Sequence, residues 1–187
     1  MTIIATLSLS GRVFSLPEID TVASGNAKIQ YPDSKTLKID AQNNTIINYK
    51  TFNINENESV IITLPSANSK ILNKVLGGDL SKILGNLNCN GIFILINNKG
   101  IYVGPKANIT AAGLVLSTRN MTNQDFLSGN YVFKKLSKDE TDMLLLTEGT
   151  IKIKDGGFGV LIAGAVENKG TIVAPLGKVV LAGGDAP

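Results

Sequence analysis

Histidine is absent from the 187-residue chain, and Cys89 is its only cysteine. The chain therefore cannot form an internal disulfide, a Ser-His or Cys-His nucleophile pair, or the usual zinc clusters. Cys89 lies between two asparagines, and we expect it to fill a small, half-buried position rather than to act as a reactive thiol. A metal could be held only by carboxylates and carbonyls, and the acidic residues do not follow EF-hand or RTX spacing. The sequence therefore predicts no metal site.

Glycine-rich and acidic stretches are the remaining candidates for chemistry. Gly156–Gly159 and Gly77–Asp79 match neither GxGxxG nor GxxxxGK[ST], and Gly177-Lys178 is followed by Val, so we interpret these glycines as turns. A carbohydrate-active enzyme would need two or more carboxylates converging on one face. The acidic residues at the predicted turns are instead scattered: Asp155, Glu167 and Asp185. We therefore predict that the protein is not an enzyme and uses no cofactor and no small-molecule substrate.

The charge pattern argues against nucleic acid as a partner. The net charge is only +3, from 18 basic and 15 acidic residues. The densest basic cluster, Lys134, Lys135 and Lys138, is followed at once by Asp139 and Glu140. We interpret this cluster as a solvated loop, because it forms no basic stripe.

The composition predicts one domain with an aliphatic β core. Hydrophobic residues make up 43% of the chain, whereas aromatic residues make up 5% and Trp is absent. Within Asn86–Thr118, short apolar runs at Ile92–Ile96, Ile101–Val103 and Leu114–Leu116 are separated by Gly, Asn and Pro. This spacing predicts strand, turn, strand, turn, strand, with a sharp turn at Asn97–Gly100.

The first third of the chain also favours strands. Alternating residues predict strands at 27–31, 36–40 and 45–49, with turns at 32–34 and 42–44. We expect 51–54 and 59–64 to form a hairpin across the polar loop 55–58. Residues 69–87 have apolar residues at helical spacing, which leaves two short helices as the alternative. Gly77-Gly78 interrupts that pattern, and we favour strands.

Internal repeats predict a solenoid. Asn98–Pro105 is echoed by Asn168–Pro175, and Gly149-Thr150-Ile151 recurs as Gly170-Thr171-Ile172. Leu161–Gly164 recurs as Val180–Gly183. Short β runs that repeat after about twenty residues are typical of the turns of a β-solenoid. Asparagines at the corners can hydrogen-bond to the turn below, and Asn97, Asn98 and Asn168 are the candidates, for a structural or a recognition role.

Two segments fall outside this pattern. Residues 120–138 are polar and predict a long connection anchored by Phe126, Tyr131 and Phe133. Residues 1–15 are weakly apolar and are interpreted as a signal peptide, the remnant of a longer one, or a first strand. No stretch approaches the roughly 20 apolar residues that span a bilayer.

Ordered fragments along the chain resemble one family, the amino-terminal secretion domain of two-partner secretion exoproteins. This domain, also called the haemagglutination activity domain, begins the filamentous-haemagglutinin and high-molecular-weight adhesins. The resemblance covers residues 16–187. The fragments that carry it are Tyr49–Ile54, Ile71–Gly78, Ser81–Gly85, Asn90-Gly91, Leu95–Ile101, Gly104, Gly113–Thr118 and Gly129–Phe133.

The resemblance implies a right-handed parallel β-helix with an amino-terminal cap and small extra-helical strands. It implies export through the periplasm by an outer-membrane β-barrel transporter with POTRA domains, and a product that is secreted or on the bacterial surface. The family's recognition motif, Asn-Pro-Asn-Gly-Ile, matches Asn97, Asn98, Lys99, Gly100 and Ile101, with Pro and the second Asn replaced. The second family motif, Asn-Pro-Asn-Leu, is absent, as it is in the adhesin branch. Further turn positions with a structural role are Asn53, Gly104, Asn168 and Gly170.

Alternatives to a working secretion domain remain open on the sequence. Family exoproteins continue far beyond this length, so residues 16–187 are interpreted as a domain truncated at its carboxy-terminal side, with any host-cell contact made downstream. A degenerate fragment of such an exoprotein is one alternative. A carbohydrate-active β-helix enzyme is another.

Overall fold

A computed structural model describes residues 16–135 and 143–184 of the chain. The signal peptide expected at residues 1–15 lies outside the described residues. The same holds for Lys138, Asp139, Glu140 and Asp185.

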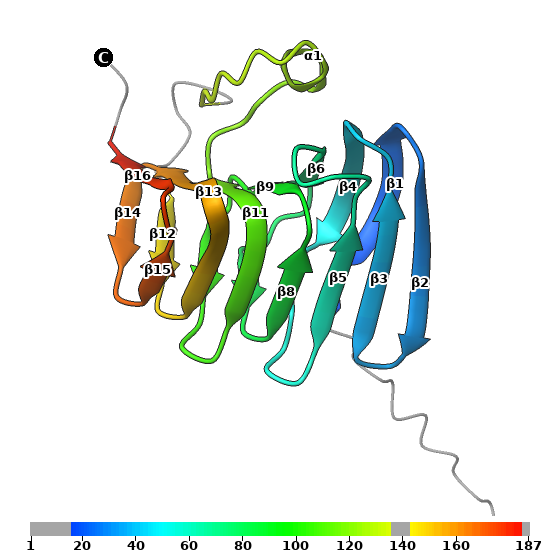
Figure 1. Cartoon of the computed structure of the whole chain (residues 1–187), viewed down its shortest axis with the longest axis horizontal. Helices are drawn as coiled ribbons and strands as arrows, with labels where there is room; N and C mark the ends of the chain where they lie inside the picture. The colour runs from blue at the N-terminus through cyan, green and yellow to red at the C-terminus, as the bar shows by residue number, and fades with distance from the viewer. Residues whose placement is uncertain (1–15, 136–142, 185–187) are drawn as a thin grey trace, which may run out of the picture.

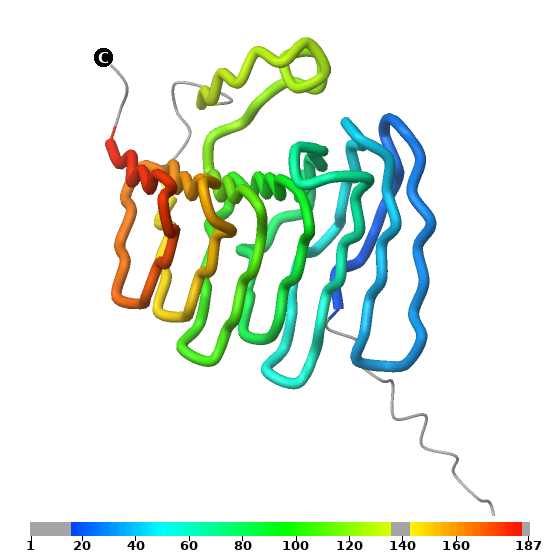
Figure 2. The backbone as a smooth tube through the Cα atoms, in the orientation of Figure 1, coloured from blue at the N-terminus to red at the C-terminus, as the bar shows by residue number. Residues whose placement is uncertain are grey.

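The chain winds into a right-handed parallel β-helix of about six turns, which confirms the predicted fold (Figures 1 and 2). Each full turn passes through three faces, in the order third, first, second. The first face stacks β4 (Thr45–Thr51), β6 (Lys70–Val75), β9 (Ile92–Ile96), the second halves of β11 (Asn108–Ser117) and β13 (Thr150–Ala163), and β16 (Lys178–Gly183). The second face stacks β7 (Ser81–Ile83), β10 (Ile101–Val103), β12 (Leu144–Thr147) and β14 (Ala165–Asn168). The third face stacks β3 (Thr36–Ala41), β5 (Ser59–Thr63), β8 (Asn86–Cys89), the first halves of β11 and β13, and β15 (Thr171–Val173).

Two antiparallel strands cap the amino-terminal end of the β-helix. Strand β1 (Glu18–Ser24) pairs with β4, and β2 (Ala27–Asp33) pairs with β3, so together they close both the first and the third face. Gly25 lies in the turn between β1 and β2 with φ +76°, and a Cβ there would lie 2.7 Å from Thr45 Oγ1. The cap therefore covers edge groups that would otherwise be open to another strand.

The interior of the β-helix is largely aliphatic, as the composition predicts. Inward-facing residues alternate with outward-facing ones along strands such as β3, where Leu37 and Ile39 are fully buried. The exception is an aromatic stack near the cap, where the Tyr49 and Phe52 rings are 5.1 Å apart and the Phe52 and Phe93 rings are 6.0 Å apart. The Tyr49 hydroxyl donates a hydrogen bond to Asn73 Oδ1 at 2.9 Å, which satisfies a polar group inside an apolar core.

A second hydrophobic cluster lies on the outer side of the first face. Residues 120–135, which we call the strap, leave the β-helix after β11 and contain the short helix α1 (Asn123–Leu127) (Figure 1). Phe126 of α1 is 1% exposed and packs with the outward side chains Ile46, Leu72, Ile94, Ile96 and Val115. Strands β4, β6, β9 and β11 of the first face are therefore covered on both sides, which suits their nearly continuous apolar sequences. Phe126 and Phe133 do anchor this connection, whereas Tyr131 is 42% exposed and lies against Phe126.

The strap is fastened to the first face by Lys74. Its amine donates hydrogen bonds to the Met121 carbonyl at 3.0 Å and to Asn123 Oδ1 at 3.3 Å. Desolvation lowers the pKa of Lys74. Asn120 and Lys134 form an isolated antiparallel bridge at the base of the strap.

The predicted hairpin at residues 51–64 is wrong. Strand β4 lies on the first face and pairs with β6, whereas β5 lies on the third face and pairs in parallel with β3 and β8. The chain between them passes through the second face at Ile54, which bridges to Ile83 in parallel. The polar loop is thus one corner of the β-helix. Its Glu58 carboxylate accepts a hydrogen bond from the Asn55 amide at 2.7 Å.

The expected strands elsewhere are confirmed, but one repeat has a different register. Residues 69–87 contain β6 and β7 rather than helices, and the strands expected in Asn86–Thr118 are β9, β10 and part of β11. Thr150 pairs with Thr171, as the repeat predicts. Leu161, however, pairs with Leu181 rather than Val180, because a one-residue shift would have placed an inward side chain over an outward one. The echo of Asn98–Pro105 lies on another face, since Thr171–Val173 belongs to the third face and Ile101–Val103 to the second.

Candidate functional site

The Asn97–Ile101 motif forms the corner between β9 on the first face and β10 on the second. Asn97 is fully buried at this corner. Its side-chain amide donates to the Asp79 carbonyl at 3.0 Å and to Ser81 Oγ at 2.9 Å, both in the preceding turn of the β-helix. Its Oδ1 accepts the Lys99 amide at 2.9 Å, and its backbone amide donates to the Ser117 carbonyl at 3.0 Å in the following turn. Asn97 therefore ties three successive turns together.

Gly100 closes the corner in a conformation that favours glycine. Its φ is +112°, and a Cβ there would lie 3.3 Å from the Leu144 carbonyl and 3.5 Å from Leu80 Cβ. The Gly100 amide donates to the Asn97 carbonyl at 3.1 Å, and its carbonyl accepts the Ser81 amide at 3.1 Å. Ile101 then points into the core and is 1% exposed. Gly100 therefore allows the backbone conformation of the corner, and Ile101 anchors the corner in the core.

Asn98 and Lys99 are the members of the motif that a partner could touch. Asn98 is half-buried and Lys99 is exposed. Both line a groove of about 490 Å³ between the corner and the end of β6, together with Lys74, Leu76, Ile96 and Asn120 among others. Leu76 is 61% exposed. The corner thus presents the Lys99 amine, the Asn98 amide and the exposed Leu76 side chain. Its backbone is held in place by the hydrogen bonds of Asn97 to the preceding turn.

Leu80 and Leu144 flank the same corner. They are 40% and 43% exposed, and Gly100 lies between them. Aliphatic side chains that are exposed around a rigid polar turn are typical of a protein-binding surface rather than of a catalytic one.

The other predicted turn residues hold the corners of neighbouring turns. Asn53 Oδ1 accepts the Lys82 amide at 2.9 Å. Asn168 Oδ1 accepts hydrogen bonds from the Thr147 hydroxyl and, at 3.2 Å, from the Gly170 amide. Each of these side chains reaches a neighbouring turn or closes its own, but not as a ladder of stacked asparagines.

Gly104 and Gly170 occupy crowded positions. A Cβ on Gly104 would lie 2.7 Å from Leu84 Cδ2, and one on Gly170 would lie 2.1 Å from the Gly149 carbonyl. Their amides donate to the Ile83 and Thr147 carbonyls at 2.8 and 3.1 Å. Both glycines therefore allow close approach between turns of the β-helix.

Asn90 was not identified as a corner residue from the sequence. Its side chain makes two short hydrogen bonds to the backbone of Leu64. Its side chain accepts the Leu64 amide at 2.6 Å and donates to the Leu64 carbonyl at 2.7 Å. The signal that could have found it is an Asn followed by Gly at the end of a strand, the same pattern that marks a turn elsewhere.

The remaining reactive groups do not assemble into a site within the described residues. Cys89 is 1% exposed, and burial raises the pKa of its thiol to about 11, so at neutral pH it stays protonated. Asp155 lies at the corner within β13, and Glu167 lies on the second face, where it pairs with Lys169 at 2.9 Å. Among residues 16–135 and 143–184, no three acidic or thiol side chains are grouped as metal ligands. Over the same residues, no helix has the length and hydropathy required to cross a bilayer.

Comparison with known proteins gives a consistent result. The model of the TPS secretion domain family matches residues 20–186. The chain is 33% identical over 174 residues to a haem/haemopexin-binding protein of Haemophilus influenzae, covering 90% of this chain and 19% of that protein. A second haem/haemopexin-binding protein of that species is 32% identical over 107 residues, 57% of this chain and 11% of that protein. The chain therefore spans about a fifth, or less, of these relatives.

A solved structure shows the same fold. The crystal structure of the HMW1 secretion domain from Haemophilus influenzae superposes with a TM-score of 0.84 at 34% identity, covering 90% of this chain and 45% of that one. Sequence and architecture agree, and the chain belongs to the family of two-partner secretion (TPS) domains, the secretion domains of HMW1-like and haem-binding adhesin exoproteins.

Proposed function

We propose that an outer-membrane transporter with POTRA domains recognises this secretion domain at the Asn97–Ile101 corner. The proposal rests on one observation: some members of the motif are buried and others are accessible to a partner. Asn97, Gly100 and Ile101 are buried and fix the backbone, whereas Asn98 and Lys99 remain accessible above the groove. A rigid turn costs little conformational entropy on binding, which favours recognition.

The partner surface that fits this corner is acidic with an apolar component. Lys99 would pair with a carboxylate, Asn98 would exchange hydrogen bonds with the partner's backbone, and Leu76 would be covered by an apolar side chain. Replacement of the family's Pro by Asn98 preserves the turn, because the Asn97 side chain caps the Lys99 amide. The chain would thus keep the shape of the motif with altered chemistry at two positions.

Folding outside the cell would bias the direction of export. Each turn of the β-helix pairs only with its neighbours, so stability accumulates turn by turn. A turn of about twenty residues contributes on the order of 1–3 kcal/mol, which makes backsliding through the transporter several-fold less favourable. The chain would therefore travel through the periplasm and seed β-helix folding outside.

A catalytic role is not proposed for this domain. Asp155 and Glu167 belong to different parts of the coil, and Glu167 is paired with Lys169. The family match over residues 20–186 favours secretion over the carbohydrate-active and degenerate-fragment alternatives.

A secretion assay tests recognition. The chain is co-expressed, behind a signal peptide, with a two-partner outer-membrane transporter, and the protein in the medium is measured. We expect secretion only with the transporter, and a strong loss with Lys99→Glu, since this change reverses an exposed charge without touching the core.

Lys169→Glu provides the matched control. Lys169 is exposed within the same Asn-Lys-Gly sequence at another corner, so its reversal should leave secretion unchanged. Equal losses from both substitutions, or none from Lys99→Glu in a folded protein, would show that the corner is not what the transporter reads.

A further inference from the structure

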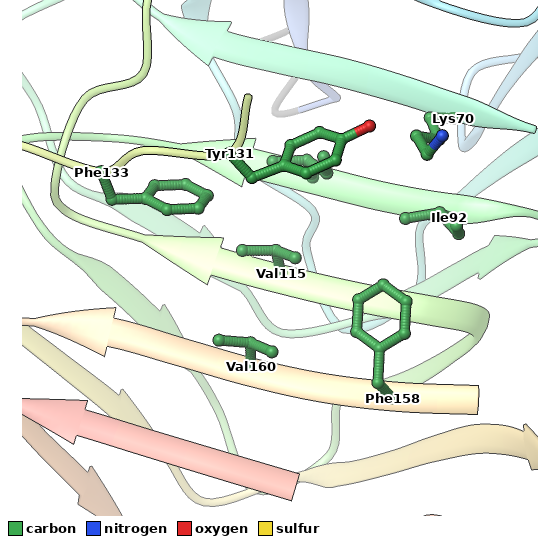
Figure 3. A pocket seen from close by; sticks show the side chains of 8 residues that line it. Lys70, Ile92, Val115, Tyr131, Phe133, Phe158 and Val160 are labelled. Carbon is green, nitrogen blue, oxygen red and sulfur yellow. The ribbon is translucent and has the colours of Figure 1, made fainter. Parts of the chain in front are cut away.

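A cavity of about 350 Å³ lies between the strap and the outer side of the first face (Figure 3). Strands β9, β11 and β13 supply aliphatic and aromatic walls, among them Val115, Phe158 and Val160. Phe133 closes the cavity from the strap. Its volume is at the lower end of the range of small-molecule sites, about 300–1,000 Å³, and its hydrocarbon lining is typical of them.

The surface of this cavity is apolar, and the nearest polar groups lie together at one end of its rim. The Tyr131 hydroxyl points toward the end occupied by the Lys70 amine, whereas Phe133 lies away from it (Figure 3). The Lys70 Nζ atom is 5.8 Å from the centre of the Tyr131 ring. Among the salt bridges that link described residues, none includes Lys70. The apolar cavity therefore has an amine and a hydroxyl beside one end of its rim.

We propose that this cavity binds a soluble, single-chain anionic amphiphile, of which a fatty-acid carboxylate is the simplest example. The acyl chain lies against Val115, Val160 and Phe158, and the carboxylate meets the Lys70 amine and the Tyr131 hydroxyl at the rim. The charge complementarity at one end favours an anion over a neutral or cationic amphiphile. The bound chain fills space between strap and β-helix, so occupancy stabilises the strap in its docked position.

The first test is a chain-length series. Octanoate, decanoate and dodecanoate, each below its micelle concentration, are titrated into the full chain by calorimetry. We expect one site and a dissociation constant that falls about fourfold per added methylene until the acyl chain outgrows the cavity. Affinity that ignores chain length, or many equivalent sites, would overturn the proposal.

A pair of variants distinguishes binding in the cavity from nonspecific binding to the apolar surface. Val160→Phe fills the cavity, whereas Val180→Phe makes the same change at the residue paired with Val160 in the next turn, outside the lining. We expect only Val160→Phe to abolish decanoate binding, with circular dichroism showing that both variants are folded. Equal binding by the two variants counts against the site.

A second pair of variants tests the role of the Lys70 amine. Neither variant introduces a larger side chain into the cavity. Lys70→Met should weaken decanoate binding about tenfold and leave decanol unaffected, because a charged hydrogen bond is lost. Lys178→Met is the control, since Lys178 pairs with the lining residue Phe158 from the next turn. Unchanged decanoate affinity in Lys70→Met contradicts the proposal, as does flotation with phosphatidylglycerol vesicles without binding of soluble decanoate.

Discussion

Asn97 is the residue on which the Asn97–Ile101 corner is built. It is buried, and its side chain uses both donor and acceptor groups, toward the preceding turn and toward Lys99. Asn98, next in sequence, is half-buried and lines the groove instead. Two neighbouring asparagines therefore have different tasks, one in stability and one at the surface.

Asn97→Ala should lower the free energy of unfolding by about 1–3 kcal/mol, because the Ser81 hydroxyl and the Asp79 carbonyl lose a buried partner. Urea unfolding followed by circular dichroism measures the change. Asn98→Ala is the matched control and should change the free energy by no more than about 0.5 kcal/mol. A larger effect for Asn98 than for Asn97 would reverse the roles assigned here.

The strap is the element that distinguishes the outer side of the first face from an ordinary solvent-facing sheet. Thr122 begins α1, where its hydroxyl accepts the Asp125 amide at 3.0 Å and donates to the Asp125 carboxylate at 2.6 Å. The hydrogen bond from Thr122, and a weaker one from Asn130, hold the pKa of the Asp125 carboxyl below its ordinary value of 3.8. The start of α1 therefore depends on an ionised carboxylate.

The strap should loosen in acid before the β-helix does. A folded-state pKa below the unfolded value gives stability that is present above about pH 4 and is lost as the pH falls through the folded value. Amide chemical shifts of α1 should change in this range, while those of β9 stay constant. Asp125→Asn should remove the transition, and an identical acid profile in that variant would contradict the assignment.

The elements could be predicted from sequence wherever one local signal has one structural meaning. Alternation predicted β2, β3 and β4, and Gly77-Gly78 argued correctly against helices in 69–87. The hairpin prediction failed because a polar loop between two strands looks the same whether the chain reverses or turns a solenoid corner. The register at Val180 and Leu181 failed because both residues are apolar, so the pattern does not identify the inward one.

The candidate site was predicted only in part. The motif Asn97–Ile101 was found through a family resemblance, but which of its members are buried depends on Ser81, Leu80 and Leu144, which come from other turns. One local sequence feature indicates that the strap covers the first face. Ile92–Ile96 is apolar at every position, as expected of a strand that is buried on both faces.

At the scale of the whole molecule, the two ends of the β-helix differ. The cap pairs with the first strands, whereas the inward positions Val179 and Leu181 of β16 are 43% and 48% exposed. A solenoid gains stability from neighbours on both sides, so its least covered turn should open first.

Hydrogen exchange read by mass spectrometry should show this gradient. We expect the slowest exchange in β6, β9 and β11, which have a neighbouring turn on each side and the strap above, and the fastest in β14 to β16. Uniform protection along the chain would mean that the whole coil opens as one cooperative unit.

The contact of Arg119 with the last turn links distant events in the chain. The Arg119 Nη2 atom donates to the Gly184 carbonyl at 3.1 Å, across 65 residues of sequence. Because Gly184 follows β16, this hydrogen bond can form only after β16 has paired with β13. The contact at the base of the strap would therefore report when the sixth turn has folded.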